Sequence, residues 1–244
     1  MPTGLGGEVL WLCPSLDDSP DDLSGNGNNG TYVNGTSTVA DSDPTYGGSR
    51  CYDFDGANDD ISTPFADTST TSTGVFSMAC WVKYDSVAAS SGLMSGDMRT
   101  GRTGLSMYFD VYNSSRGHGG LLNPAVGGQY SGRVHAGDRD TTNTGQWYHV
   151  AYTGDGSTAR IYVDGVEENS AAQTLTTSGA WSYPLRIGSY IDRGTVEGYL
   201  NGRMDDVRVY TRTLTQAEIT LLASVRGFTS GAGTQIHRTL LGVG

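Results

Sequence analysis

The chain has 244 residues, 36% of them hydrophobic, and a formal net charge of −11. This length suits one all-β domain, because sandwiches of about 200–250 residues commonly fold as a single unit. The acidic balance, with Lys83 as the only lysine, argues against nucleic acid and anionic membrane surfaces as partners, because their phosphates are neutralised by clustered Lys and Arg.

The N-terminal part of the chain predicts one strand followed by a long polar loop. Residues 8–13 (EVLWLC) form the strand-like run, and residues 17–35 are rich in Asp, Asn, Ser and Gly. The first residues, MPTGLGGEVLW, have no basic region followed by an apolar run, and no stretch of the chain is apolar enough to span a bilayer. We therefore expect no Sec-type signal peptide and no membrane insertion.

Two central segments carry clear strand patterns. Residues 49–63 (SRCYDFDGANDDIST) predict a strand, a turn and a short strand. Residues 74–86 (GVFSMACWVKYDS) alternate with a period of two, which predicts that one set of side chains faces a sandwich core and the other the outer face. The two sets are Phe76, Met78, Cys80 and Val82, and Ser77, Ala79, Trp81 and Lys83. Residues 91–146 are less regular and favour strands separated by variable loops.

The three cysteines lie in strand-like contexts. Cys13, Cys51 and Cys80 are odd in number and have no CxxC spacing, which disfavours a disulfide framework or a zinc site. We expect buried free thiols. Pairing of Cys13 with Cys51 is the alternative if their strands are neighbours.

The last third of the chain predicts a hairpin, two further strands and a helix. Residues 147–167 (WYHVAYTGDGSTARIYVDGVE) read as two strands joined at Gly154-Asp155-Gly156. Residues 185–190 (LRIGSY) form a strand that ends in glycine, and residues 198–219 run from a strand into a helix. Thr215 and Glu218 form a capping box, which predicts a short helix over about 216–223.

The order of these segments and their residue motifs resemble those of the laminin-G-like branch of the concanavalin A-like lectin/glucanase superfamily. The element ALxFDGxxDYI of that family is similar to residues 49–63, and its FSVSAWVK strand is similar to residues 74–86. The resemblance implies an all-β, two-sheet antiparallel β-sandwich (jelly roll) with one short C-terminal helix, over residues 1–224. Residues 225–244 exceed the family pattern. Their apolar end predicts either a frayed terminus or, through residues 226–244, an arm that docks on another subunit or a virion partner.

The resemblance also implies a structural calcium site. In the family, the aspartate that opens the last-strand motif commonly supports Ca²⁺, with oxygens from the N-terminal loop. Here the implied ligands are Asp205, Asp22, Asn26 and the carbonyl region of Gly25. Asp205 is spaced in register with Val207, so we expect it to point inward, where a lone carboxylate is costly. The alternative is that Asp205 accepts backbone amides or pairs with Arg203 or Arg208 without a metal.

A second group of oxygen donors follows the strand in residues 49–63. In calcium-dependent relatives such as pentraxins, an acidic pair in a comparable place helps to bind a calcium that contacts the ligand. The residues that match this place are Asp55, Asn58, Asp59 and Asp60. The alternative is a tight turn that closes two strands.

A glycan-binding role needs exposed aromatic rings with polar neighbours. The candidates in the variable loops are Trp181, Tyr183, Tyr190, Tyr130 and Tyr112. The alternative is that these rings cap sheet edges. No glutamates fall in the spacing with which glucanases of this fold flank a glycosidic bond, so we predict no catalytic residues and no enzyme activity.

The functional hypothesis is a non-catalytic recognition or adhesion module. It would bind a glycan or another cell-surface component, outside the cell or on a virion surface. The second hypothesis is a structural phage decoration or tail-associated protein with no ligand of its own, and the third is a glycoside hydrolase.

Overall fold

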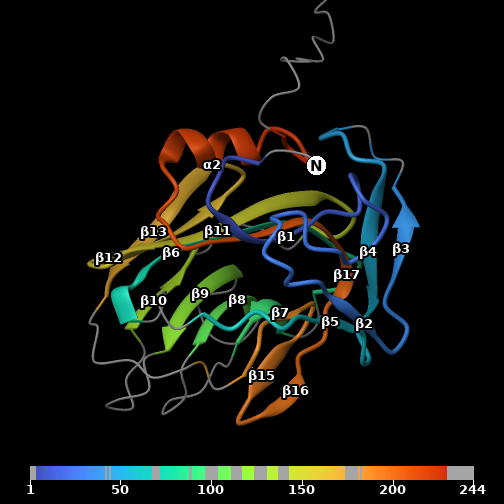
Figure 1. Ribbon diagram of the computed structural model, residues 1–244, viewed down its shortest axis with the longest axis horizontal. Helices are drawn as coiled ribbons and strands as arrows, with labels where there is room; N and C mark the ends of the chain where they lie inside the picture. The colour runs from blue at the N-terminus through green and yellow to red at the C-terminus, as the bar shows by residue number, and fades with distance from the viewer. Residues whose placement is uncertain are drawn as a thin grey trace, which may run out of the picture.

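The computed structural model describes residues 4–41, 43, 45–67, 72–87, 90–96, 104–110, 117–123, 131–136, 143–173, 181 and 183–229. Two large antiparallel sheets pack face to face, and one short helix lies on the outer side of the first sheet (Figure 1). The predicted fold class is therefore confirmed. None of the helices in these ranges has the length and apolar character needed to cross a membrane.

The first sheet has the order β13-β12-β11-β6-β17-β4-β3, and β1 also pairs with β17. Its strands are β1 (Glu8–Leu12), β3 (Ser37–Ala40), β4 (Arg50–Asp55), β6 (Val75–Tyr84), β11 (Trp147–Asp155), β12 (Thr158–Val163), β13 (Val166–Ala172) and β17 (Asn201–Tyr210). The predicted hairpin of residues 147–167 is confirmed as β11 and β12, which pair in continuous register.

The second sheet has the order β10-β9-β8-β7-β14-β5-β2. Its strands are β2 (Thr31–Val33), β5 (Asp60–Ser62), β7 (Ser91–Ser95), β8 (Gly104–Asp110), β9 (Gly117–Asn123), β10 (Ser131–His135) and β14 (Arg186–Ile187). A separate hairpin, β15 (Tyr190–Asp192) and β16 (Thr195–Glu197), projects beside this sheet at the bottom of Figure 1.

The β15–β16 hairpin lies against the outer face of β7. The backbone amide of Ile191 donates to the Ser95 hydroxyl at 3.4 Å. Gly92 permits the close approach, because a Cβ at that position would lie only 2.0 Å from the carbonyl oxygen of Ser189. The hairpin thereby covers part of the second sheet's outer surface.

The alternation in β6 places its two sets of side chains as the sequence predicts. Phe76, Met78, Cys80 and Val82 are fully buried in the main core between the sheets. Trp81 faces the opposite side, where it packs with Trp147 in a separate cluster. Both faces of this sheet are therefore covered.

The predicted helix is α2 (Gln216–Leu222), and its capping box is present as expected. Thr215 accepts from the Glu218 amide, and the Glu218 carboxylate accepts from the Thr215 amide at 2.8 Å. Ile219 and Leu222 are buried against the outer face of the first sheet. The cap fixes where the helix begins, and the apolar side fixes which way it faces.

A bulge in β17 changes the predicted orientation of Asp205. Asp206 adopts a positive φ of 49°, and the pairing with β6 shifts register between Asp205 and Arg208. Because of the extra residue, Met204 and Val207 both face the main core. The expectation that Asp205 shares the inward face of Val207 is wrong: Asp205 pairs opposite Trp81 and lies under the sheet's outer covering.

Residues after α2 pack into the sandwich. The Arg226 amide donates to the Tyr46 carbonyl at 2.8 Å, and the Gly227 amide donates to Asp206 Oδ2 at 3.2 Å. The Phe228 carbonyl accepts from Arg208 Nη2. The folded unit therefore continues past the boundary predicted at residue 224. The rest of the predicted arm, residues 230–244, lies outside the described residues, and its docking role stays a prediction.

All three cysteines are free thiols and are buried, so the expectation of unpaired thiols is confirmed. The alternative pairing of Cys13 with Cys51 does not occur. Burial raises the pKa of each thiol, most directly that of Cys80, which lies within the main core.

We predict that a chain ending at Ser224 is much less stable than one ending at Ser230. The shorter chain lacks Arg226, whose charge is buried against Asp41, and removing one partner of a buried pair costs about 3–5 kcal/mol. Urea unfolding followed by circular dichroism measures the difference. Equal midpoints for the two chains would show that residues 225–229 do not contribute to stability.

Candidate functional site

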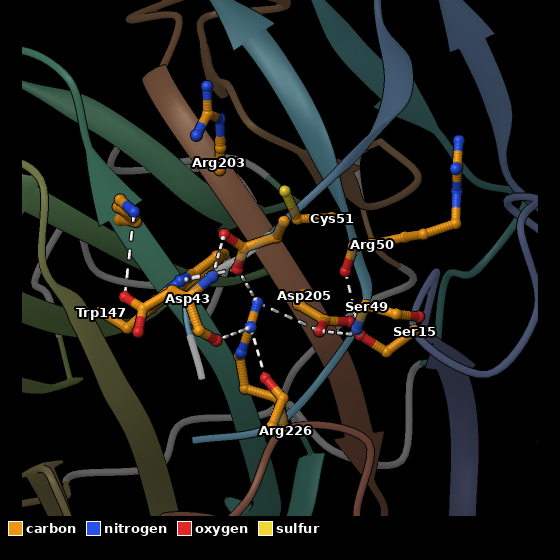
Figure 2. Close-up of polar contacts among 12 residues, drawn as sticks. Ser15, Asp43, Ser49, Arg50, Cys51, Trp147, Arg203, Asp205 and Arg226 are labelled. Atoms are coloured by element: carbon orange, nitrogen blue, oxygen red, sulfur yellow. Dashed lines mark hydrogen bonds and ion pairs between the residues drawn. The ribbon is translucent and has the colours of Figure 1, made fainter. Parts of the chain in front are cut away.

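Two buried arginines occupy the outer side of the first sheet, where the calcium site was predicted. Arg226 is 2% exposed and lies beside Asp205, with 3.7 Å between its Nη1 and Asp205 Oδ2 (Figure 2). The same Nη1 lies 2.6 Å from Asp41 Oδ2. Its guanidinium carbon is 4.3 Å from the centroid of the Trp147 ring. The Trp147 indole donates to the same Asp41 oxygen at 3.0 Å. The positive charge is thus enclosed by an aromatic ring and two carboxylates.

Arg208 forms the second buried pair. Its Nε and Nη2 donate to the two oxygens of Asp206 at 2.7 and 3.1 Å. The guanidinium carbon lies 4.1 Å from the centroid of the Trp11 ring, and the Trp11 indole donates to Asp206 Oδ1 at 2.7 Å. Glu8 Oε1 lies 3.4 Å from Nη1. This bidentate pair is set up by the bulge, which brings the side chains of residues 206 and 208 to one side.

Asp205 is held by hydrogen bonds from protein groups. The Ser15 hydroxyl donates to Oδ2 at 2.5 Å, and the Asp206 amide donates to Oδ1 at 2.7 Å. The Cys13 thiol donates to Oδ1 at 3.5 Å. Burial, followed by the neighbouring charge of Asp206, raises the pKa of Asp205 to about 7.

The predicted loop ligands serve other purposes. Asp22 Oδ1 accepts from the Trp11 amide at 2.9 Å and Oδ2 accepts from the Asn28 amide at 2.9 Å. The Asn26 side chain donates to the Glu8 carbonyl at 3.1 Å. Gly25 has a φ of +83° and shapes the turn between them. These contacts brace the loop against β1 and link none of the three residues to Asp205.

The residues around Asp205 do not fit a divalent cation. The Arg226 guanidinium lies 3.7 Å from Asp205 Oδ2 and would repel a metal ion in the same place. Within the described ranges, no group of three His, Cys, Asp or Glu side chains is arranged to hold a metal. Calcium binding stays a prediction, and these contacts do not support it.

The second predicted oxygen cluster is divided among separate structural contacts. Asp55 Oδ1 accepts from the amides of Ala57 and Asn58 at 2.7 and 3.3 Å, which is the geometry of an Asx turn. Asp59 Oδ1 accepts from the Gly35 amide at 2.7 Å. Asp60 makes neither of these contacts and pairs with Arg186 on β14. The alternative of a tight turn describes this segment better than a shared ligand site.

Trp181 does not present an exposed stacking surface. Its ring is 7% exposed and packs edge to face on Phe65, with ring centroids 5.4 Å apart. It belongs to the main core, and Gly96 lies directly against it. The expectation that Trp181 stacks on a sugar is therefore wrong. Tyr112 and Tyr130 lie outside the described residues.

Tyr183, another predicted candidate, lines a pocket between the β15–β16 hairpin and the second sheet. The pocket, here called the hairpin pocket, encloses about 140 Å³ and is lined by Ser62, Tyr183, Pro184, Arg186, Ile191, Gly194 and Val196. Gly194 has a φ of +83°, and a Cβ on it would lie 2.4 Å from the Tyr183 hydroxyl. Tyr190 is half-buried and packs on Gly198, on the same hairpin but outside the pocket lining.

The charged residue of the hairpin pocket is fixed by a buried carboxylate. Arg186 Nη1 lies 3.0 and 3.1 Å from the two oxygens of Asp60, and the Ser189 hydroxyl donates to Asp60 Oδ2 at 2.9 Å. Burial raises the pKa of Asp60, and Arg186 opposes that effect. Sequence reasoning missed Arg186, because nothing in the pattern links it to an aspartate 126 residues earlier.

A sequence profile of the family Laminin_G_3, described as the concanavalin A-like lectin/glucanases superfamily, matches residues 55–220. The match covers more than half of the chain, so the chain belongs to this family. No curated protein sequence matches the chain at a significant level.

Several solved structures share the fold. Domain 4 of AbnA, a GH43 extracellular arabinanase from Geobacillus stearothermophilus, solved in complex with arabinotriose, has a TM-score of 0.65 at 15% identity and covers 91% of this chain and 100% of its own. The binding domain of Paraclostridial Mosquitocidal Protein 1 has a TM-score of 0.67 at 15% identity, with coverages of 89% and 52%. The binding domain of botulinum neurotoxin DC, solved in complex with SialylT, has a TM-score of 0.65 at 12% identity, with coverages of 89% and 51%. The chain thus spans about half the length of the two toxin domains.

We predict that EDTA leaves the Tm of the protein unchanged, because Asp205 is satisfied by Ser15 and faces Arg226. Differential scanning calorimetry with EDTA and with added Ca²⁺ measures this. A Tm that rises by several degrees with Ca²⁺ and falls with EDTA would show that the folded protein binds calcium and would contradict this prediction.

We also predict that replacing Asp205 with Asn removes one component of the pH dependence of stability. The folded-state pKa of about 7 lies above the unfolded value of about 3.9, so the unfolded state binds fewer protons between these limits. Stability from this group is therefore fully present below about pH 3.9 and is lost as the pH rises from there to about 7, by up to about 1.4 kcal/mol per pH unit. The buried histidines are present in both wild type and Asp205→Asn, so their contribution cancels in the difference between the two unfolding free energies.

Urea unfolding at pH 5, 6, 7 and 8 gives the difference in unfolding free energy between wild type and Asp205→Asn. The wild type is expected to lose stability relative to Asp205→Asn as the pH rises to about 7, and the difference should then level off. The exposed Asp21→Asn serves as the control and should give no such trend. A flat difference for Asp205→Asn would mean that its carboxylate is ionised throughout.

Proposed function

We propose that this member of the concanavalin A-like lectin/glucanases superfamily is a non-catalytic glycan-binding module whose hairpin pocket receives one sugar ring. The observation that carries the proposal is the composition of that pocket. Its lining combines the aromatic Tyr183 and three apolar residues with the polar Ser62 and Arg186; the apolar residues are Pro184, Ile191 and Val196. Sugar rings combine apolar C–H faces with hydroxyl rims, and binding sites match them with this mixture of aromatic and polar groups.

The position of the pocket supports a binding role. Its floor comes from β5 and β14, which pair through Arg186 and Ser62, and its outer wall comes from the β15–β16 hairpin. A loop or hairpin on a rigid sheet is the usual location of ligand contacts. The volume of about 140 Å³ is below that of sites for drug-sized ligands, so one ring of a longer chain is the appropriate occupant.

The lining of the pocket supports a non-catalytic role. Glycoside hydrolysis needs two carboxyl groups on opposite sides of the scissile bond. None of the seven described lining residues is acidic, and the adjacent Asp60 is 1% exposed and bonded to Arg186. A pocket with this lining can hold a sugar but supplies no acid and base pair.

The solved neighbours are consistent with this assignment. One was solved with arabinotriose and another with SialylT, and two are toxin binding domains. We extend the proposal to an attachment role outside the cell or on a virion surface, as the sequence predicts. The alternative of a decoration or tail-associated protein, with self-association through residues 226–244, stays a prediction with its own test by light scattering.

We predict that Tyr183→Ala weakens glycan binding by about tenfold or more, because truncation of a central aromatic contact commonly removes at least that much affinity. A glycan array identifies the ligand and titration calorimetry measures the change. Tyr46→Ala is the matched control, because this half-buried tyrosine packs on Trp81, on the other sheet. An array with no bound glycan, or equal affinities for the two variants, would contradict the proposed site.

A further inference from the structure

The hairpin pocket has one charged wall, and its charge is opposite to that of the protein. Arg186 is the single charged residue among the seven described residues that line the pocket, in a chain of net charge −11. Its side chain is 27% exposed, whereas that of its partner Asp60 is 1% exposed. The cation therefore faces the pocket and the carboxylate is withdrawn beneath it.

The pairing with Asp60 uses one end of the guanidinium. Both short contacts are made by Nη1, at 3.0 and 3.1 Å. A guanidinium has five N–H donors in a rigid fork. Among the described residues, no hydrogen bond uses Nη2 or Nε of Arg186. These two nitrogens form an edge that matches the two oxygens of a carboxylate.

The orientation of Arg186 is fixed before a ligand arrives. Asp60 is itself held by the Ser189 hydroxyl at 2.9 Å, and its carbonyl accepts from the Thr36 hydroxyl at 2.9 Å. Arg186 lies on β14, which is hydrogen-bonded to β5 on one side and β7 on the other. A side chain that is positioned in this way loses little freedom on binding.

We propose that the hairpin pocket selects an acidic sugar residue, such as a uronic or sialic acid, whose carboxylate pairs with the Nε–Nη2 edge of Arg186 while its ring lies against Tyr183. This inference rests on the proposed glycan-binding function and adds the class of ligand. One carboxylate on one residue suits a single arginine, whereas the overall negative charge of the chain disfavours a polyanion. The competing explanation is that Arg186 and Asp60 form a purely structural pair.

The first experiment needs no variant. Titration calorimetry of the full chain compares galacturonic acid with its methyl ester, and sialyllactose with its methyl ester. In each pair the carboxylate charge is the only group that changes. We expect at least one acidic probe to bind about tenfold or more tightly than its neutral match, since charge-assisted hydrogen bonds have about this value. Raising the salt concentration should reduce the preference.

The second experiment assigns the preference to Arg186. Arg186→Lys keeps the charge but loses the fork, and is expected to lose most of the preference. Because Arg186→Gln alone would leave Asp60 buried without its partner, the double variant Arg186→Gln, Asp60→Asn removes both charges together. Arg203→Gln is the matched control: its Nε pairs with Asp53 at 3.1 Å and its side chain is 32% exposed, but it lies on the other sheet. It should retain the full preference.

The outcomes separate the two proposals. A neutral probe that binds as well as its acidic match overturns the acidic ligand and leaves glycan binding intact. An acidic preference that survives in the double variant also overturns it, because the selectivity then lies elsewhere. If no glycan binds, acidic or neutral, on the probes or the array, both the ligand class and the proposed function fail.

Discussion

The burial of two guanidinium groups determines how the outer side of the first sheet is built. A guanidinium removed from water is stable only where its charge and donors are matched, and Arg208 and Arg226 meet this condition with carboxylates, carbonyls and indole rings. Their partners come from β1, from the loop after β3, from the bulge in β17 and from residues 225–229. These distant parts of the chain are therefore stable only together. The bulge at Asp206 is the local distortion that makes this possible, because it turns a carboxylate out of the core and toward Arg208.

The two outer faces of the sandwich consequently differ in character. The first sheet is covered by α2, the N-terminal loop and the segment after the helix (Figure 1). The buried charged side chains under this covering pair with one another. The second sheet carries the β15–β16 hairpin, which leaves a small pocket with an arginine and a tyrosine on its walls. The pairing of β5 with β14 fixes the positions of Ser62 and Arg186 in the floor of the pocket.

The features that the sequence predicted are those with local or periodic signals. The alternation of β6, the hairpin of β11 and β12, and the capping box at Thr215 each depend on neighbours within about ten residues, so the pattern shows them directly. The orientation of Asp205 was missed because a bulge shifts the period by one residue and leaves no mark in composition. Trp181 was misjudged because its Gly and Pro neighbours suggested a loop, while Phe65 and Gly96, far away in the chain, provide its burial. The pair of Arg186 and Asp60 also depends on strand pairing between distant segments, which one sequence does not reveal.

The three buried cysteines give the folded and unfolded chains different chemistry. Thiol–disulfide exchange proceeds through the thiolate, and burial raises the pKa of Cys13, Cys51 and Cys80, so the folded protein carries almost no reactive sulfur. Unfolding returns all three thiols to ordinary ionisation at once. An odd number cannot be satisfied by pairing within one chain, so in an oxidising medium at least one thiol is left to cross-link with another molecule. Unfolding under such conditions becomes irreversible, and the lifetime of the protein is then set by the rate at which it unfolds rather than by its equilibrium stability.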